Sequence, residues 1–195
     1  MEVIRTDRLI LRRLSPADAE FIFELVNDPD WLRYIGDRGV RTLDDARRYI
    51  LQGPMAMYDA RGYGLYCVVL RESGVPVGIC GILKRDALED VDIGFALLPR
   101  FRARGFAFEA AAATLEYGSR TLKLSRIVAI VSPENHVSRR LLEKLGFRCE
   151  RSFEIAPGDE VCLYSSRLHH LTFSAPSSTE DDMADNHDVD AFDSF

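Results

Sequence analysis

The hydrophobic and polar positions in the first part of the chain predict one strand followed by two helices. Residues 8–14 (RLILRRL) alternate apolar and charged side chains, as a half-buried strand does. The Ser-Pro pair at 15–16 suits the start of a helix, and residues 27–29 (NDP) end it. A second helix is expected over residues 42–51, with its end at the Gly-Pro pair 53–54.

From residue 64 onward the period of the pattern changes, and short apolar runs predict strands. The run at 126–131 (RIVAIV) is continuously apolar after its first residue, which indicates a strand buried on both faces. Gly146 suits the C-terminal end of a helix over residues 135–145. The expected strands are 64–71, 75–84, 91–98, 126–131, 147–155 and 161–168, and the expected helices are 106–122 and 135–145.

This order of elements predicts an α/β fold in which a central mixed sheet carries helices on both faces. The unit over residues 91–131 should be a parallel, right-handed β-α-β crossover. We expect one domain over residues 1–171. Residues 172–195 hold seven carboxylates and no lysine or arginine, so we expect an acidic, disordered tail there. Without that tail the net charge of −6 becomes +1 (−6 + 7).

Composition and charge argue against several classes of function. No apolar run approaches the ~18 residues that a membrane-spanning helix needs, so no membrane partner is expected. The near-neutral folded part argues against a nucleic-acid partner. Neither the four cysteines nor the four histidines show metal-ligand spacing, so no metal is expected. Buried, reduced thiols in a cytoplasmic protein are expected instead.

A cluster of arginines precedes the alanine-rich helix expected at 106–122. Arg100, Arg102 and Arg104 lie where a helix N-terminus already carries positive charge, which is unfavourable unless an anion binds. Backbone N–H groups at such a terminus, a glycine such as Gly105 and arginine side chains can together hold a phosphate. The segment lacks the spacing of a P-loop and of a GxGxxG loop. The alternative is a solvated basic turn with a capping glycine.

Three stretches of the chain, in order and at matching spacing, resemble the GNAT superfamily of acetyl-CoA-dependent N-acetyltransferases, and most of all its RimJ/RimL type. They are TDRLILRRLSPAD (6–18), DIGFALLPRFRARGFAFEA (92–110) and SPENHVSRRLLEKLGF (132–147). The resemblance covers roughly residues 5–168. It implies a GNAT-like acyl-CoA N-acyltransferase fold, in which the mixed sheet is mostly antiparallel and the fourth and fifth strands of the family splay apart.

The resemblance implies that acetyl-CoA is the co-substrate. Pantetheine would lie between the splayed strands and pair with the backbone near Phe95 and Leu97. The backbone N–H of about Leu97 would polarise the thioester carbonyl, which is worth several kcal/mol in known acyl transfer. The backbone around the arginine cluster would hold the pyrophosphate, through Arg102, Ala103, Arg104, Gly105, Phe106 and Ala107.

The chain departs from the family pattern at two positions. Ala103 stands where relatives often carry glycine; it suits the site only if its φ is negative, and we expect slightly weaker cofactor binding. The tyrosine that protonates the leaving thiolate in many relatives is Leu142 here. Ser138 is then the candidate for a hydrogen bond to the departing sulfur, or it satisfies backbone groups in the first turn of its helix. Asn135 contacts pantetheine, caps that helix, or does both.

Two carboxylates near the implied cleft, Asp92 and Glu154, are candidates for the general base. Asp92 would relay a proton through water, and its alternative is an exposed acid at a strand edge. A basic side chain is not obligatory, because holding both substrates together provides much of the acceleration and solvent offers a route for the proton.

The acceptor site would be built by residues 30–63 and the last hairpin, where aromatic side chains can line a pocket. The candidates are Trp31, Tyr34, Arg38, Tyr58 and Tyr63. The aromatic residues among them would otherwise be ordinary core. Arg38 would bind a substrate carboxylate, or pair with Asp37 or Asp28.

The resemblance therefore predicts an N-acetyltransferase that moves the acetyl group of acetyl-CoA to a primary amine of a small molecule or of a protein or peptide N-terminus. The amine would attack directly in a ternary complex. The alternative is a catalytically weak GNAT-fold module that binds acyl-CoA or a peptide. Nothing in the sequence selects the acceptor amine, and a monomer or a homodimer is expected.

Overall fold

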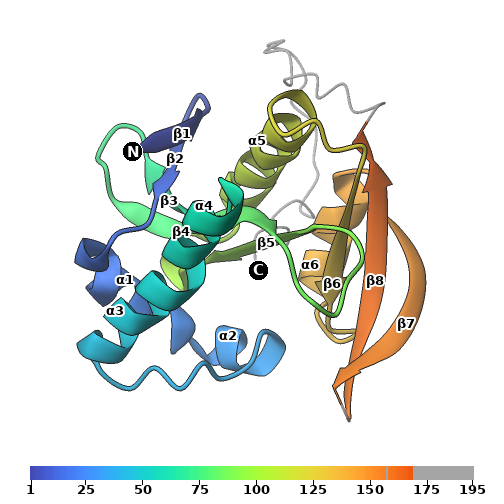
Figure 1. Cartoon of the computed structure of the whole chain (residues 1–195), viewed down its shortest axis with the longest axis horizontal. Coiled ribbons are helices and arrows are strands. Elements are labelled where there is room, and N and C mark those ends of the chain that lie inside the picture. Colours follow the sequence, from blue (N-terminus) through green and yellow to red (C-terminus); the bar gives the residue numbers. More distant parts are fainter. Residues whose placement is uncertain (157, 169–195) are drawn as a thin grey trace, which may run out of the picture.

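The computed structural model describes residues 1–156 and 158–168, and their strands form one sheet of eight strands in the order β1-β2-β3-β4-β5-β6-β8-β7 (Figure 1). The strands are β1 (Glu2–Arg5), β2 (Leu9–Arg13), β3 (Leu65–Leu70), β4 (Pro76–Leu83), β5 (Asp92–Leu97), β6 (Arg126–Val131), β7 (Arg148–Ala156) and β8 (Asp159–Arg167). The helices are α1 (Ala19–Val26), α2 (Pro29–Tyr34), α3 (Leu43–Ile50), α4 (Ala56–Arg61), α5 (Phe106–Arg120) and α6 (His136–Lys144), with short turns η1 (Pro16–Asp18), η2 (Leu51–Met55) and η3 (Pro99–Phe101).

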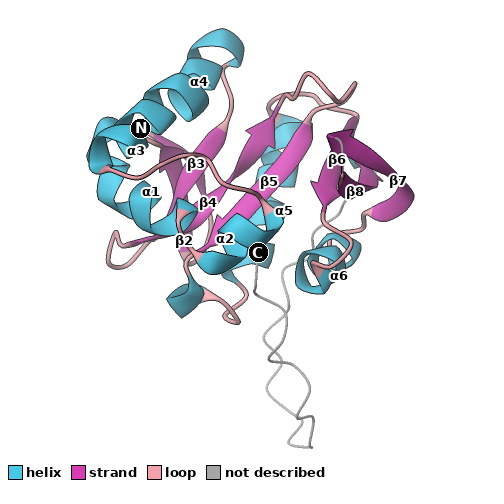
Figure 2. Cartoon of the chain, turned by 90° about the horizontal axis from the view of Figure 1, so that it is seen from below, coloured by secondary structure: helices cyan, strands magenta, loops and turns pink. Residues whose placement is uncertain are grey.

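Helices cover both faces of the sheet, which confirms the predicted mixed α/β architecture (Figure 2). Successive residues of β3 show why, because their side chains alternate between two cores. Tyr66 and Val68 pack in the core that contains α5, whereas Cys67 and Val69 pack in the core that contains α1 and α3. The paired strands are antiparallel except β5 and β6, which are parallel as expected.

The parallel strands β5 and β6 separate along their length, as the resemblance implied. Their pairing consists of one bridge, Asp92 with Val128, in which the Val128 N–H donates to the Val91 carbonyl at 3.0 Å. In contrast, β5 pairs with β4 over its whole length, from Asp92 to Leu97. The two strands therefore diverge beyond the bridge (Figure 2). One edge of β5 is left facing the space between them.

Two elements differ from the prediction. Residues 2–5 form β1, which is too short for a period-two pattern to reveal. The helix expected to end at residues 53–54 continues instead through η2, a π-helical turn containing Pro54, into α4. A π-turn relieves the clash that a proline ring makes in a regular α-helix, so the proline does not end the helix. Gly62, with φ of 79°, ends it.

Burial of the cysteines differs from the prediction at one position. All four thiols are free, and three of them are buried, but Cys149 is exposed on β7. No helix among the described residues is long and apolar enough to cross a membrane. No group of histidine, cysteine or acidic side chains in the described part could hold a metal ion. The predicted acidic tail, residues 172–195, lies outside the described residues.

Candidate active site

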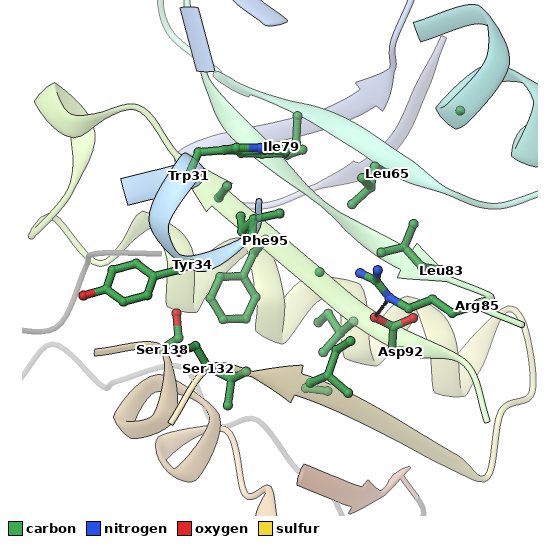
Figure 3. A pocket seen from close by; sticks show the side chains of 18 of the residues that line it. Trp31, Tyr34, Leu65, Ile79, Leu83, Arg85, Asp92, Phe95, Ser132 and Ser138 are labelled. Atoms are coloured by element: carbon green, nitrogen blue, oxygen red, sulfur yellow. Dashed lines mark hydrogen bonds and ion pairs between the residues drawn. The ribbon is translucent and has the colours of Figure 1, made fainter. Parts of the chain in front are cut away.

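A cavity of about 320 Å³ occupies the space where β5 and β6 diverge (Figure 3). Residues 92–96 of β5 form one wall, and residues 129–131 of β6 form another. The start of α6 and the helix α2 complete it, with further residues from α3, η2 and α4. The cavity therefore exists because two parallel strands share only one bridge.

The edge of β5 that faces β6 carries backbone amides at alternating positions. The Leu98 N–H donates to the Val77 carbonyl of the strand on the other side, at 2.8 Å. Hydrogen-bonding direction alternates along a strand, so the N–H groups of Phe95 and Leu97 point away from β4 and toward the gap. Phe95 lines the cavity, whereas Leu97 is fully buried and does not.

Asp92 is a buried carboxylate at the closed end of this gap. Its side chain is 1% exposed, and its Oδ2 accepts a hydrogen bond from Arg85 Nε at 2.9 Å. Its Oδ1 is buried with no hydrogen-bond partner among the described residues. Burial raises the pKa of Asp92, and the neighbouring Arg85 and Lys84 only partly offset this. Asp92 is therefore not the exposed strand-edge acid that the sequence left as an alternative.

Ser138 and Asn135 lie together at the start of α6 and both line the cavity. The Asn135 Oδ1 accepts a hydrogen bond from the Ser138 N–H at 3.0 Å, so Asn135 caps the helix. Both residues are 5% exposed. The side chain of Ser138 points toward Tyr34 and Phe95 (Figure 3). The capping role that the sequence suggested for Asn135 is confirmed, and it coexists with a place in the cavity wall.

The predicted acceptor residues divide into two groups. Trp31, Tyr34 and Arg38 line the cavity. Tyr58 does not, because it is a buried core residue whose hydroxyl accepts from the Leu14 N–H at 3.2 Å and donates to the Leu65 carbonyl.

Tyr63, a candidate for substrate contact, and Glu154, a candidate general base, also lie elsewhere. Tyr63 is half-buried and packs against the core that contains α5. Glu154 is exposed on β7, which is an edge strand separated from β6 by β8. Neither lines the cavity. The structure therefore does not bring Tyr58, Tyr63 and Glu154 to the cavity, because the fold directs these side chains into a core or to a distant edge.

Several cavity residues were missed by reasoning from the sequence. Arg85 and Lys84 follow directly after β4, and Tyr49 comes from α3. Ser132 lies just beyond the end of β6. Two adjacent cations at the end of a predicted strand were a usable signal, because strand ends often position functional side chains. Tyr49 carried no such signal, since it reads as one aromatic residue on an amphipathic helix.

The loop after β5 uses its arginines differently from the expectation. Arg102 is 11% exposed on its side chain, and its guanidinium contacts Asp28 and Asp30, each at 2.7 Å. Its Nε also donates to the Leu97 carbonyl at 3.1 Å. Arg100 is about half exposed and pairs with Glu24. The alternative of a solvated basic turn is thus wrong for Arg102, whose nearly buried side chain joins the loop to Asp28 and Asp30.

The backbone of this loop leads into α5 through two left-handed residues. Gly105 has φ of 76° and is the N-cap of α5. Ala103 has φ of 57°, so the condition of negative φ that we set for alanine there is not met. Phe106 and Ala107 begin the helix and are buried, and the Arg104 carbonyl accepts from Arg8 Nη1 at 2.9 Å. The loop does not line the cavity; it lies at the other end of β5.

Comparison with known proteins gives a consistent result. The family model for the acetyltransferase (GNAT) domain matches residues 8–148. The Bacillus subtilis protein YnaD, described as an uncharacterized N-acetyltransferase, is 31% identical over 159 residues, which cover 80% of this chain and 90% of YnaD. A GNAT-family acetyltransferase from Bacillus anthracis has a crystal structure with a TM-score of 0.72 at 32% identity, covering 86% of this chain and 99% of that one.

The fold also matches more distant structures. RimL, a ribosomal L7/L12 alpha-N-protein acetyltransferase solved in complex with coenzyme A, superposes with a TM-score of 0.73 at 18% identity. The alignment covers 86% of this chain and 98% of RimL. The match of the family model and the relatives above 30% identity go beyond the fold. This chain therefore belongs to the GNAT family of acetyltransferases, whose acetyl donor is acetyl-CoA.

Proposed function

We propose that this GNAT acetyltransferase moves the acetyl group of acetyl-CoA to a primary amine by direct attack in a ternary complex. The acceptor is a small molecule or a protein or peptide N-terminus. The observation that carries the proposal is the cavity between β5 and β6, because it gathers strand amides, the buried carboxylate of Asp92 and the hydroxyl of Ser138. These are the group types that acyl transfer to an amine uses.

The described residues fit a coenzyme A molecule laid along β5. The N-terminus of the fifteen-residue helix α5 offers N–H groups to the pyrophosphate, and Gly105 has no side chain to obstruct it. The outward-facing amides of Phe95 and Leu97 would pair with pantetheine as a further strand would. Arg102 contributes only its backbone, since Asp28 and Asp30 already hold its side chain.

The chain's own groups would then assist each part of the transfer. The amine nitrogen bonds to the thioester carbon, the carbon–sulfur bond breaks, and coenzyme A leaves with the electron pair on sulfur. We assign the contact with the developing oxyanion to the Phe95 amide, because Phe95 lines the cavity, and pairing with pantetheine to the Leu97 amide. Ser138 would donate a hydrogen bond to the leaving sulfur. Asp92 would accept the proton that the amine loses, directly or through water.

A relationship to the RimJ/RimL type is part of the proposal. Its support is the fold of RimL and of the ribosomal-protein-S5-alanine acetyltransferase from Vibrio fischeri, which superposes with a TM-score of 0.70 at 17% identity. Both identities are too low to transfer an acceptor. The expectations of a cytoplasmic enzyme and of a monomer or homodimer stay predictions.

The test is a coenzyme A release assay with a panel of amines and N-terminal peptides. The purified chain should release thiol with at least one acceptor. Ser138→Ala and Asp92→Asn should each lower kcat/KM by more than tenfold. Glu154→Gln, which removes the exposed acid of β7, is the matched control and should change kcat/KM by less than twofold. If neither Ser138→Ala nor Asp92→Asn slows turnover by more than threefold, the catalytic assignments are wrong.

The same experiment separates the enzyme from the binding module. Acetyl-CoA binding is measured in parallel by calorimetry. Binding without thiol release for any member of the panel would identify a catalytically weak module instead.

A further inference from the structure

The end of the cavity near Asp92 is positively charged. Three cationic side chains, Arg38, Lys84 and Arg85, line the cavity, and Asp92 is its one carboxylate among the described residues. The Lys84 ammonium is already bound by main-chain carbonyls, including that of Glu89 at 3.1 Å. Its charge still adds to the local field. The cavity wall thus carries more positive charge than its own carboxylate balances.

Arg38 has neither of the partners that the sequence suggested for it. Asp37 pairs with Arg41 instead, and Asp28 pairs with Arg102. Within residues 1–156 and 158–168, the guanidinium of Arg38 makes no hydrogen bond and no ion pair. A cation that lines a cavity without a protein counter-ion has its donors available to a ligand.

Arg85 also has N–H donors that the described residues do not use. Its Nε is used by Asp92 Oδ2, while its two terminal nitrogens make no hydrogen bond in the described part of the chain. The close view shows these nitrogens turned toward the cavity (Figure 3). The charges of both arginines act on the phenol of Tyr49. Burial raises the pKa of this phenol, and the charges of Arg38 and Arg85 both act to lower it. Tyr49 and both arginines line the same cavity.

Coenzyme A phosphates do not account for these cations. Asp92 begins β5 and Leu97 ends it, so about 17 Å of extended strand separate the cationic end from the loop that precedes α5. The α5 N-terminus lies beyond that second end. Lys84 and Arg85 therefore lie far from the proposed pyrophosphate site, in the part of the cavity left for the acceptor.

We propose that the acceptor amine also carries a carboxylate close to its amino group, and that Arg38 and Arg85 bind this carboxylate. The proposal rests on the function proposed above. Because Arg85 Nε holds Asp92 Oδ2, a carboxylate on the terminal nitrogens of Arg85 places the amino group beside Asp92 Oδ1, which has no hydrogen-bond partner among the described residues. An α-amino acid, or a peptide with an acidic residue near its N-terminus, has this chemistry. Polyamines and aminoglycosides would be repelled by the same charges.

The experiment compares matched acceptors for binding and for turnover. Binding is measured by calorimetry with the protein saturated with coenzyme A, so that no reaction is required. The probes are α-amino acids against their amides, C-terminally amidated peptides with aspartate or asparagine at the second position, and spermidine. Thiol release with acetyl-CoA is measured for the same set. The variants are Arg38→Gln and Arg47→Gln, which removes an exposed arginine of α3 that does not line the cavity.

At least one acid should bind ten times more tightly than its neutral partner, and Arg38→Gln should remove that preference while Arg47→Gln keeps it. Preference confined to amino acids or to acidic peptides identifies the source of the carboxylate. The proposal would be overturned if acids and amides bind equally or if spermidine binds more tightly. It would also be overturned if no acid binds at concentrations of about 10 mM. Failure of thiol release alone, with the acid preference intact, would instead contradict the proposed transferase function.

Discussion

Arg102 and Asp28 form a nearly buried ion pair of 2.7 Å that joins the loop after β5 to the N-cap of α2. Asp28 also accepts hydrogen bonds from the N–H groups of Asp30 and Trp31, so it caps the helix that carries Trp31 and Tyr34. The pair therefore connects the proposed pyrophosphate loop to one wall of the cavity. An arginine that the sequence presented as an anion ligand is instead part of the scaffold.

Removing the ion pair between Arg102 and Asp28 should destabilise the protein. Arg102→Ala leaves the Asp28 carboxylate buried without its cation, and we expect the free energy of unfolding to fall by about 3 kcal/mol. The exposed Arg100–Glu24 pair provides the comparison, because Arg100→Ala should cost less than about 0.5 kcal/mol. Urea unfolding of both variants measures the difference. Equal losses would contradict the structural role of Arg102.

The acid limb of the pH–rate profile should depend on Asp92 and Arg85. Asp92 must be ionised to accept a proton, and burial raises its pKa, so kcat/KM should fall as the pH drops through that raised value. Arg85 and Lys84 lower the same pKa. Arg85→Gln should therefore move the acid limb to higher pH, and Asp92→Asn should abolish it. An acid limb that stays in place in Arg85→Gln would show that another group titrates.

Replacing Ala103 by glycine should stabilise the protein and tighten acetyl-CoA binding. An alanine at φ of 57° carries a steric cost of about 1–2 kcal/mol, and the greater freedom of glycine in the unfolded chain removes part of the gain. We expect Ala103→Gly to raise the free energy of unfolding by about 0.5–1 kcal/mol. It should also tighten acetyl-CoA binding, measured by calorimetry. Lys123, which has the same φ at the far end of α5, is the control: Lys123→Gly should stabilise without changing acetyl-CoA affinity.

Gly105 should be essential for acetyl-CoA binding. Its φ of 76° disfavours any side chain, and a Cβ there would approach Arg8 Nη2 to 3.1 Å. Gly105→Glu also puts a negative charge at the N-terminus of α5, so we expect it to abolish binding, with Gly105→Ala intermediate. Arg100→Ala should change the Kd less than twofold. A circular dichroism spectrum shows whether the variants are folded, and tight binding by folded Gly105→Glu would place the pyrophosphate elsewhere.

Tyr58 and Tyr34 should behave oppositely when their hydroxyl groups are removed. Tyr58→Phe leaves the Leu14 N–H and the Leu65 carbonyl without their partner, so we expect a loss of about 1–2 kcal/mol in the free energy of unfolding with no change in the acceptor KM. Tyr34→Phe, at the cavity, should change KM more than stability. Thermal unfolding and steady-state kinetics measure both. A raised acceptor KM in Tyr58→Phe would contradict this prediction and would show that Tyr58 contributes to the acceptor site.

Local signals along the sequence were enough to predict most of the helices and strands and part of the site. The alternation at residues 8–14, the Thr42 cap and the apolar run at 126–131 all correspond to observed elements, because these features act over a few residues. The motif from Asp92 to Ala107 indicated the family and the order of strand, loop and helix. Together with the stretch at 132–147, it also placed Phe95, Asn135 and Ser138 in one region, and all three line the cavity.

Only the tertiary structure decided which distant residues meet. Arg102 finds Asp28 seventy-four positions away, Tyr58 lies in a core instead of the cavity, and Arg85 and Tyr49 join Arg38 at the cationic end. The sequence by itself determined the family and most of the secondary structure, since both depend on local patterns; β1 and the continuation of α3 through η2 into α4 were the exceptions. The position and role of each polar side chain depended on the partners that folding brought near it. A charged group is stable in a buried position only where it meets an opposite charge or a hydrogen-bonding group.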